Sequence, residues 1–416
     1  MKLMKTLFIV PYKHLFPPRN GGMLRNYHLV QELAKFSNLT LLVLQNETDF
    51  RNGQNNYEWN NSIRIISPVV SFQKNTFFRN IINSVKGRYY RKRLFESSNI
   101  FLLQTYPVLK NLLKSEKFDV VIYAHLQSLS LEPLIRKYNS KALNILDAHN
   151  VDHLLYFQEN ERMNAKQFRH YKRLKKQESS LYKKVNMFMS CSLEDKEVLE
   201  TINGFRLEGF IIPNGADTNR LHFQKHKNYT EKRVLFCGTL DYLPNRDGLI
   251  WFYINVWVKL TEAHPDLILT VIGRNGSSSD YDVLRHDSSV EFEGDVESVL
   301  PFYYKSIIAI VPLHKGSGTR LKILEAMCLG CPVVSTSIGA QGIDFEHLVN
   351  ISIADTDQEM FDSINYLLSN PVKCNFLRDN ARKLIVEKYS WNGIGIQLAQ
   401  ILENRIHKNN RTKFSA

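Results

Sequence analysis

The sequence GSGTRLKILEAMCLGCPVVSTSIGAQG, residues 316–342, decides the fold class of the second half of the chain. It follows an apolar run, SIIAIVPL (306–313), whose length and β-branched residues predict a buried strand. A glycine-flanked turn then opens a predicted helix over 319–330, which ends at Gly330. A further strand, PVVST (332–336), follows at once. This alternation of strand and helix is typical of a parallel α/β sheet.

The start of the predicted helix carries charges that suit a bound anion. Arg320 and Lys322 lie in its first turn, where a cation opposes the helix dipole at a cost of about 0.3–1 kcal/mol. Two cations, a glycine loop with Gly316 and Gly318, and free backbone amides together predict a phosphate-binding site. Glu325 lies on the same helix face as Lys322 and can accept hydrogen bonds from a ribose diol. A surface helix with scattered charge is the alternative.

This segment resembles the nucleotide-sugar end of retaining glycosyltransferases of family 4, which have the two-domain GT-B fold. Two Glu residues separated by seven residues mark the donor site of that family; Glu325 matches the second, and Ser317 stands at the position of the first. A branch with the motif Gly-Ser-Gly-Thr-Arg-Leu-Lys-x-Leu-Glu-Ala is the nearer match. The resemblance implies that Arg320 and Lys322 contact the donor diphosphate. Ser317 or Thr319 is expected to cap the helix.

Length and composition fit a two-domain globular protein. The chain has 416 residues, enough for two domains of about 200. No apolar run approaches the length of about 18 residues that a membrane-spanning helix needs. The start, MKLMKTLFIVPYKH, predicts a first strand and not a signal peptide. The five cysteines, an odd number, indicate a reducing cytoplasm, and we expect Cys328 and Cys331 to pack in the core and not to bind zinc.

The net charge of +13 is concentrated in two segments of the first half. They are FRNIINSVKGRYYRKRLFE (78–96) and KQFRHYKRLKKQESSLYKKV (166–185). Aromatic residues interleave with the cations, which suits nucleic acid or an anionic membrane surface. No nucleic-acid-binding motif accompanies them, so we expect a peripheral protein on the inner face of the plasma membrane that binds no nucleic acid. A solvated basic face is the plain alternative.

Strand-like runs alternate with helical stretches in both halves of the chain. The other runs are TLFIVP (6–11), LTLLVL (39–44), DVVIYA (119–124), ALNILDA (142–148), NMFMSCS (186–192), RVLFCG (233–238), LILTVIG (267–273) and VEFEG (290–294). They predict two Rossmann-like domains with doubly wound parallel sheets that face a cleft. We expect an acceptor-binding domain over 1–205 and a nucleotide-sugar-binding domain over 206–389. The segment 390–416 is expected to be a helix that returns to the first domain, followed by a tail.

The first half offers a glycine pair and a histidine-rich strand end. Gly21 and Gly22 open a helix after the first predicted strand, although a plain tight turn explains them equally well. The resemblance implies that this pair, followed by Arg25, approaches the donor phosphates or the acceptor. It also implies that His149, in ILDAHNVDH (145–153), lies near the transferred sugar; a loop histidine satisfied by its neighbours is the alternative. A similar argument for His125 is weaker, and we expect that residue to be structural.

Further glycines and a cation follow strands of the second half. Gly238 ends the first of these strands, and GTLDYLPNRDGLIWF (238–252) resembles a segment of the same family branch. The resemblance offers Arg246 as an additional phosphate cation. Gly273 ends the next strand, where a base or ribose is expected to approach the backbone.

The resemblance therefore implies a glycosyltransferase that moves a hexosyl group, with retention, from a UDP- or GDP-sugar to a saccharide or lipid-linked saccharide. Such an enzyme would act in bacterial surface polysaccharide or glycan assembly, with no cofactor and no metal. The predicted catalytic residues are His149, Lys322 and Glu325. The predicted donor-binding residues are Gly21, Gly22, Gly238, Arg246, Gly273, Gly316, Ser317, Gly318, Thr319, Arg320, Lys322 and Glu325. A GT-B phosphorylase or epimerase, and a nucleic-acid-binding protein that uses the basic first half, are the alternatives.

Overall fold

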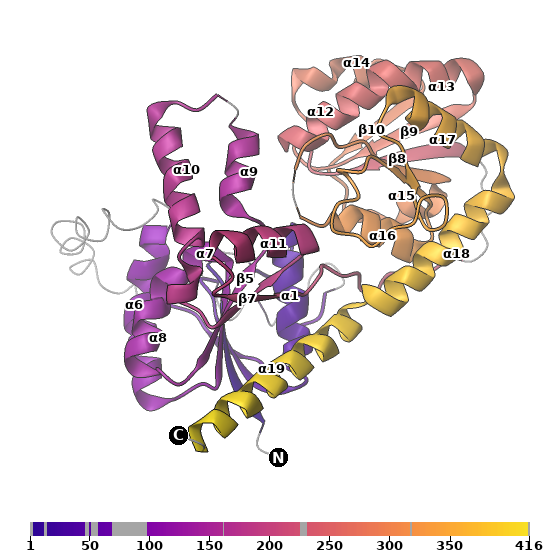
Figure 1. The fold of residues 1–416 in the computed structure, drawn as a ribbon. Coiled ribbons are helices and arrows are strands. Elements are labelled where there is room, and N and C mark those ends of the chain that lie inside the picture. Colours follow the sequence, from indigo (N-terminus) through magenta and orange to yellow (C-terminus); the bar gives the residue numbers. More distant parts are fainter. Residues whose placement is uncertain are drawn as a thin grey trace. The chain divides into compact units, whose positions relative to one another are not determined.

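The protein forms two compact units (Figure 1). The structure is a computed structural model that describes residues 3–11, 15–45, 50, 57–68, 98–160, 162–224, 231–316 and 318–414. Unit 1 consists of Met1–His153, Phe168–Ile212 and Gly395–Ala416, and unit 2 of Leu154–Gln167 and Pro213–Ile394. The main change of unit, at 212/213, lies close to the expected boundary at 205/206.

Unit 1 is built on a seven-stranded sheet in the order β3-β2-β1-β4-β5-β6-β7. All neighbouring strands are parallel. The strands are β1 (Met4–Ile9), β2 (Ser37–Leu42), β3 (Arg64–Ile66), β4 (Val120–Ala124), β5 (Leu143–Ala148), β6 (Met187–Ser190) and β7 (Glu208–Ile211). The helices include α1 (Gly21–Leu33), α6 (Ser98–Ser115), α7 (His125–Ser128), α8 (Glu132–Tyr138), α9 (Asp152–Glu159), α10 (Ala165–Glu178) and α11 (Leu193–Ile202). The central strands are buried along their length, as their apolar runs require.

Unit 2 repeats this plan with six parallel strands in the order β10-β9-β8-β11-β12-β13. The strands are β8 (Lys232–Cys237), β9 (Leu267–Ile272), β10 (Val290–Gly294), β11 (Ile308–Val311), β12 (Val333–Ser335) and β13 (Ser352–Ile353). The helices include α12 (Leu243–Phe252), α13 (Val258–Ala263), α14 (Asp282–Arg285), α15 (Leu300–Lys305), α16 (Leu321–Leu329), α17 (Asp357–Ser369) and α18 (Pro371–Lys388). The prediction of two doubly wound α/β sheets is confirmed.

The strand orders place a topological switch point in each sheet. The chain adds strands on one side of β1 and then returns to place β4 on its other side. The same reversal occurs in unit 2, where β9 and β11 flank β8. In open α/β sheets, ligands bind outside the carboxyl ends of the strands at such points. A ligand site is therefore expected at the residues that follow β1 and β4 in unit 1, and at those that follow β8 and β11 in unit 2.

Helix α16 begins later than the sequence predicted. Its first residue is Leu321, and Arg320 is the N-cap residue, with extended backbone and no side-chain capping hydrogen bond. The expectation that Thr319 caps the helix is wrong, because its hydroxyl donates to the carbonyl oxygen of Gly342 instead, at 3.4 Å. Ser317, the other expected cap, lies outside the described residues. The predicted end is confirmed, since Gly330 takes the left-handed conformation at the C-cap with φ of 74°.

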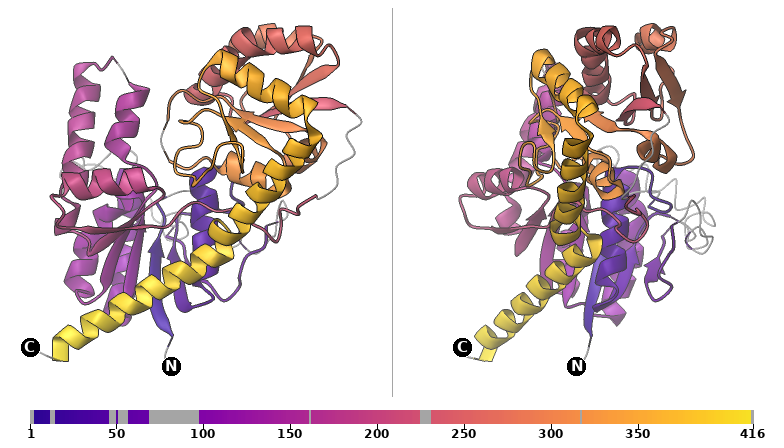
Figure 2. Two further views of the ribbon diagram at one scale, coloured as in Figure 1. Left: turned by 45° about the vertical axis from the view of Figure 1, so that its right-hand side comes forward. Right: turned by 90° about the vertical axis from the view of Figure 1, so that its right-hand side faces the viewer.

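The last helix, α19 (Trp391–Phe414), continues from unit 2 into unit 1, as expected from the sequence. From Gly395 onward it belongs to unit 1, where it runs beside α1 (Figure 2). A β-carbon at Gly395 would lie 2.5 Å from Cβ of Glu32, so glycine permits this close approach of α1. Further along, Arg405 forms an ion pair with Glu208 of β7, the edge strand of the sheet.

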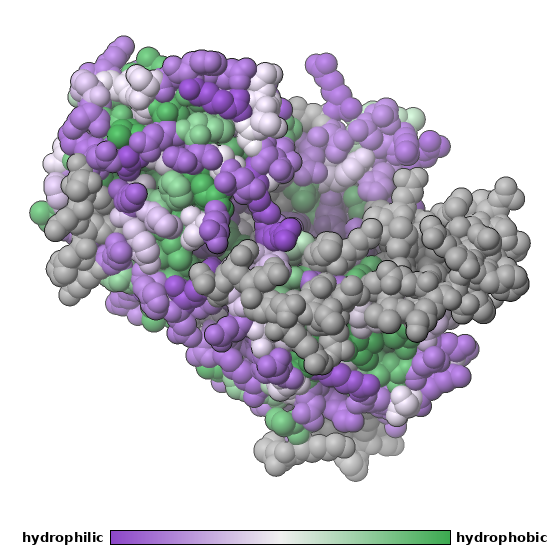
Figure 3. All heavy atoms as spheres, turned by 180° about the vertical axis from the view of Figure 1, so that it is seen from behind, coloured by the Kyte–Doolittle hydropathy of each residue, from purple (hydrophilic) through white to green (hydrophobic). Residues whose placement is uncertain are grey.

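Hydrophilic residues predominate on the face of the molecule shown in Figure 3. Exposed hydrophobic side chains occur both singly and in pairs one helical turn apart, such as Leu154 with Phe157 and Val372 with Phe376. Within the described ranges, we find no helix with the length and apolar character that crossing a membrane requires.

The close approach of β8 and β9 at their carboxyl ends gives a stability prediction. A β-carbon at Gly273 would lie 1.7 Å from the carbonyl oxygen of Gly238, so Gly273→Ala must force the two strand ends apart. Gly294→Ala is the control, because Gly294 has φ of 68° but no heavy atom within 4 Å of an added β-carbon. The control should cost about 1–2 kcal/mol, from the left-handed backbone alone. Thermal denaturation should show a clearly larger loss for Gly273→Ala; equal losses would contradict the close packing.

Candidate functional site

The ammonium group of Lys322 lies at the switch point of unit 2. Lys322 is in the first turn of α16, and its Nζ donates a hydrogen bond of 2.8 Å to Oδ1 of Asn245 on α12. The same ammonium lies 5.1 Å from the centre of the Phe236 ring of β8, a cation–π contact. A β-carbon at Gly238 would lie 2.8 Å from Nζ, so the glycine that ends β8 leaves the space that the lysine occupies.

Asn245 fixes the direction of this lysine. Its Nδ2 donates to the carbonyl oxygen of Thr239 at 2.8 Å, which turns its Oδ1 toward Lys322. Asn245 was not among the site residues predicted from the sequence. Its burial at the start of α12 becomes visible only in the structure.

Lys322 and Glu325 are partly buried. Burial lowers the pKa of Lys322 to about 8, although nearby Glu325 opposes this shift. Burial also raises the pKa of Glu325 to about 6, against the attraction of Arg220 and Lys322. The hydrogen-bond acceptor of Lys322 is a neutral amide. A phosphate placed beside this ammonium would therefore offer it a charged acceptor where its present one is neutral.

The loop before α16 is shaped by two glycines with left-handed backbone. Gly316 has φ of 121° and Gly318 has φ of 75°, conformations that residues with a β-carbon rarely adopt. Nη1 of Arg320 donates to the carbonyl oxygen of Gly318 at 2.7 Å, and its Nη2 comes within 2.5 Å of where a β-carbon of Gly316 would lie. The guanidinium therefore folds back over the loop. The structure brings Gly316, Gly318 and Arg320 together here.

Arg246 lies in a different environment from the predicted phosphate site. Its guanidinium forms ion pairs with Asp280 at 3.2 Å and with Asp247 at 3.4 Å, and about a third of the side chain is exposed. A phosphate contact would have to compete with both carboxylates, so the role of Arg246 stays a prediction. Gly273 lies as expected at the end of β9, against Gly238.

Unit 1 holds a buried charged network at the carboxyl end of its sheet. Arg25 of α1 and Asp147 at the end of β5 form an ion pair, with Nη2–Oδ1 at 2.7 Å and Nε–Oδ1 at 3.1 Å. Their side chains are 1% and 0% exposed. Nε2 of His149 lies 3.1 Å from Oδ2 of the same carboxylate. Burial favours the neutral carboxyl, but Arg25 and His149 hold the pKa of Asp147 below its ordinary value.

A second histidine completes this network. The ring of His125, directly after β4, lies 3.6 Å from that of His149, centre to centre. His125 has φ of 62°, a left-handed conformation that is uncommon for a residue with a β-carbon and that concentrates at functional sites. Burial, and then the neighbouring His149, lowers the pKa of His125 well below its ordinary value. The expectation that His125 has only a structural part came from a strand-end argument that could not reveal this backbone strain.

The glycine pair opens α1 at the same end of the sheet. Gly21 and Gly22 are its first two residues, and the Oδ1 of Asn20 caps the helix by accepting from the amide of Met23 at 2.9 Å. Arg25 follows on the same helix, so the predicted glycine pair and the buried network share α1.

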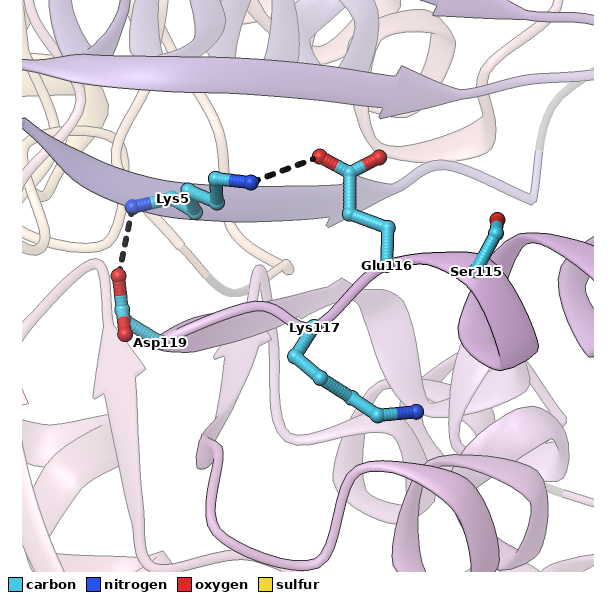
Figure 4. Close-up of a pocket in the computed structure, with 5 residues that line it drawn as sticks. All are labelled: Lys5, Ser115, Glu116, Lys117 and Asp119. Carbon is cyan, nitrogen blue, oxygen red and sulfur yellow. Dashed lines mark hydrogen bonds and ion pairs between the residues drawn. The ribbon is translucent and has the colours of Figure 1, made fainter.

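A polar pocket in unit 1 lies at the other end of the strands, away from the buried network (Figure 4). Its lining residues are Lys5, Ser115, Glu116, Lys117 and Asp119. They surround the amino ends of β1 and β4, and their charges pair with one another. Nζ of Lys5 lies 3.3 Å from Glu116, and the amide of Lys5 donates to Asp119 at 2.8 Å. None of the predicted site residues lines this pocket.

Metal ligands do not gather in the described part of the chain. No group of three or more His, Cys, Asp or Glu side chains within those residues has an arrangement that could hold a metal ion. Cys328 and Cys331 are buried, and neither forms a disulfide bond.

The chain is similar to a known protein family, to a bacterial protein and to solved structures. Residues 231–370 match the family described as Glycosyl transferases group 1. A Klebsiella pneumoniae protein, described as an uncharacterized 44.6 kDa protein in the cps region, is 26% identical over 319 residues, which cover 67% of this chain and 80% of that protein. Among solved structures, the sucrose-phosphate synthase of Thermosynechococcus elongatus superposes with a TM-score of 0.71 at 15% identity, over 97% of this chain and 100% of its own.

A second structural neighbour carries ligands. Anabaena Alr3699/HepE, solved in complex with UDP and glucose, superposes with a TM-score of 0.65 at 14% identity, over 96% of this chain and 100% of its own. These likenesses show the GT-B fold. Together with the family match over most of unit 2, they support a GT-B glycosyltransferase.

The position of Lys322 gives a binding prediction. Lys322→Ala should weaken the binding of UDP or GDP by about tenfold to a hundredfold, because a hydrogen bond to a charged group contributes about 1.5–3 kcal/mol. Lys305→Ala, which removes an exposed lysine of the same unit, is the control and should leave the dissociation constant unchanged. Isothermal titration calorimetry measures both. Equal affinities for the two variants would remove Lys322 from the site.

The lowered pKa of Lys322, about 8, adds a dependence on pH. The ammonium form binds phosphate, so affinity should be steady below that pKa and should fall by up to about tenfold for each pH unit above it. Titrations from pH 7 to about pH 9.5 keep Glu325, with its pKa of about 6, ionised throughout. The Lys322→Ala variant should show no such decline. A flat profile for the unaltered protein would contradict the assignment.

Proposed function

We propose that this chain is a retaining glycosyltransferase that uses a UDP- or GDP-sugar as donor. The observation that carries the proposal is the partly buried Lys322 ammonium at the switch point of unit 2, beside the Gly316–Arg320 loop. The acceptor is a saccharide or a lipid-linked saccharide in bacterial surface polysaccharide or glycan assembly. The Klebsiella relative in a cps region supports this setting, and the Anabaena neighbour with UDP and glucose supports the donor class.

The chemistry follows from the charge that develops during transfer. Breaking the bond between the sugar and the diphosphate leaves positive charge on the sugar and negative charge on the leaving phosphate. Preorganised donors aimed at the leaving group lower this barrier. Lys322, Arg320 and the amides of the loop before α16 would fill that part, and Glu325 would hold the ribose hydroxyls. His149 would orient the transferred sugar. Retention rests on the resemblance to family 4.

Turnover tests this proposal directly. With a UDP- or GDP-sugar and an acceptor, Lys322→Ala should lower kcat by about a hundredfold or more, as expected when one leaving-group donor is lost. Lys305→Ala should retain full activity. Product analysis by NMR should show the anomeric configuration of the donor. Release of a sugar phosphate when inorganic phosphate replaces the acceptor would favour the phosphorylase, and conversion of the donor sugar without transfer would favour the epimerase.

The basic segments support a second part of the proposal, peripheral contact with the anionic inner face of the plasma membrane. The segment 78–96 lies outside the described residues. The other segment begins with α10, which extends away from the sheet of unit 1 (Figures 1 and 2). No Asp or Glu occurs from Asn164 to Gln177, and the exposed stripe of the helix holds Phe168, Arg169, Lys172, Lys175 and Lys176.

Such a stripe is self-repulsive unless an anionic surface faces it. Like charges three or four residues apart destabilise a helix by about 0.2–0.5 kcal/mol per pair. Nζ of Lys172 lies 4.5 Å from the ring centre of Phe168, which is 46% exposed. An aromatic ring among cations suits the headgroup region of a membrane. The base of the helix is fixed by Glu178, whose carboxylate is 2.5 Å from Nδ1 of His153.

Cosedimentation with vesicles tests the membrane contact. Each cation near an anionic surface contributes about 1 kcal/mol, so the triple variant Arg169→Glu, Lys172→Glu and Lys176→Glu should bind anionic vesicles about a hundredfold more weakly. The control reverses three exposed lysines elsewhere in unit 1, Lys114, Lys137 and Lys141, and should bind normally. Binding should also disappear at high salt. Equal loss for both variants would leave α10 as a solvated face, and salt-sensitive binding to nucleic acid alone would favour that alternative.

A further inference from the structure

We propose that Arg25 and Asp147 form a positioning pair that holds His149 as a neutral imidazole, with its proton on Nε2 and its Nδ1 available to accept a hydrogen bond from a substrate hydroxyl. This proposal rests on the proposed function for the identity of the substrate. The tautomer and its cause stand on the geometry of unit 1 alone.

The carboxylate of Asp147 sets the tautomer. It is fully buried and ionised by its ion pair with Arg25, and its Oδ2 lies 3.1 Å from Nε2 of His149. An ionised carboxylate can only accept hydrogen bonds, so Nε2 must carry the proton. In a neutral ring the other nitrogen then has a free lone pair. Among the described residues, the hydrogen bond to Asp147 is the one that His149 makes, so Nδ1 is left for a ligand.

Two further contacts keep the ring neutral and in place. Besides Asp147, the ionisable groups that act on the His149 ring include Arg25 and His125, and Cys191 lies close to Arg25. The positive charge of Arg25 disfavours a second positive charge on the ring. Burial lowers the pKa of His149, while Asp147 opposes the shift. The ring of His125, at 3.6 Å, covers one face of the imidazole and restricts its rotation. The left-handed backbone of His125, with φ of 62°, is the conformation in which that residue makes this contact.

The position of the pair in the fold points to a ligand and not only to stability. A buried ion pair is weak grounds for a stabilising role, because apolar residues of similar size are often as good. This pair lies where β4 and β5 end, beside the switch point of the sheet, and it supports a histidine whose side chain retains 6% exposure. A network with these features is expected where a hydroxyl must be held in one orientation. Arg25 and Asp147 are positioning residues, because they act through His149.

The test begins with NMR of the ring nitrogens in protein labelled with ¹⁵N-histidine at pH 7. The signals of His149 and His125 are assigned from His149→Gln and His125→Gln. The expected result is a single neutral tautomer of His149, with the proton on Nε2. A proton on Nδ1, or a charged ring, would overturn the proposal whether or not the protein transfers sugar.

Variants then separate positioning from folding. Asp147→Asn leaves Arg25 buried without its carboxylate and can unfold the protein, so the second variant replaces both residues, with Arg25→Met and Asp147→Leu. The double variant should remain folded, bind UDP or GDP with unchanged affinity, and show a mixture of His149 tautomers. Its kcat should fall by about a hundredfold, the cost of a misplaced catalytic contact. A retained single tautomer or an unchanged kcat would overturn the proposal, whereas loss of nucleotide binding by the unaltered protein would defeat the proposed function instead.

Discussion

The second unit is organised around one partly buried ammonium group. Lys322 reaches the end of β8 because Gly238 has no side chain there, and Asn245 gives it an oriented but uncharged acceptor. Burial lowers its pKa to about 8, although Glu325 lies nearby. A cation kept in this state is stabilised by a bound anion more than a fully hydrated one would be. In the proposed donor site, the glycine loop, the start of α16 and the strand end at Gly273 would surround that anion.

The two units share a topology but differ in the partners of their cations. Both place their notable residues at the carboxyl ends of strands next to a switch point. In unit 1 the buried cation, Arg25, already has a carboxylate partner in Asp147. That site is internally neutralised, so the group proposed to meet an uncharged hydroxyl is the imidazole of His149. In unit 2 the hydrogen-bond acceptor of Lys322 is an amide, which leaves room for a diphosphate. The contrast supports the proposal that unit 2 carries the leaving-group chemistry and unit 1 orients the sugar.

The strands and the glycine loop before α16 could be predicted from the sequence, because their signals are local. Runs such as 119–124 and 267–273 are mostly apolar, and both became interior strands. Edge strands such as β3 and β13 were missed, since strands of three and two residues carry too little pattern. Gly330 was recognised as the end of α16 because a left-handed cap favours glycine.

The contacts that define the sites depend on residues distant in sequence. Asn245 and Lys322 are 77 residues apart, and Arg25 and Asp147 are 122 apart, so spacing could not pair them. The start of α16 was misplaced because the hydroxyl of Thr319 bonds to Gly342, beyond any local capping signal. The ion pairs of Arg246 with Asp247 and Asp280, and the strained backbone of His125, likewise appear only once the chain is folded.

Hydrogen–deuterium exchange with and without UDP or GDP tests the central claim most directly, because it locates the nucleotide on the chain without requiring turnover. The donor site described for unit 2 predicts that nucleotide slows exchange in peptides covering 318–325 and 238–246, and leaves the peptide around Lys5 and Glu116 unchanged. Protection confined to other segments, or none at a nucleotide concentration that saturates binding, would contradict the assignment of Lys322 and its loop to the diphosphate.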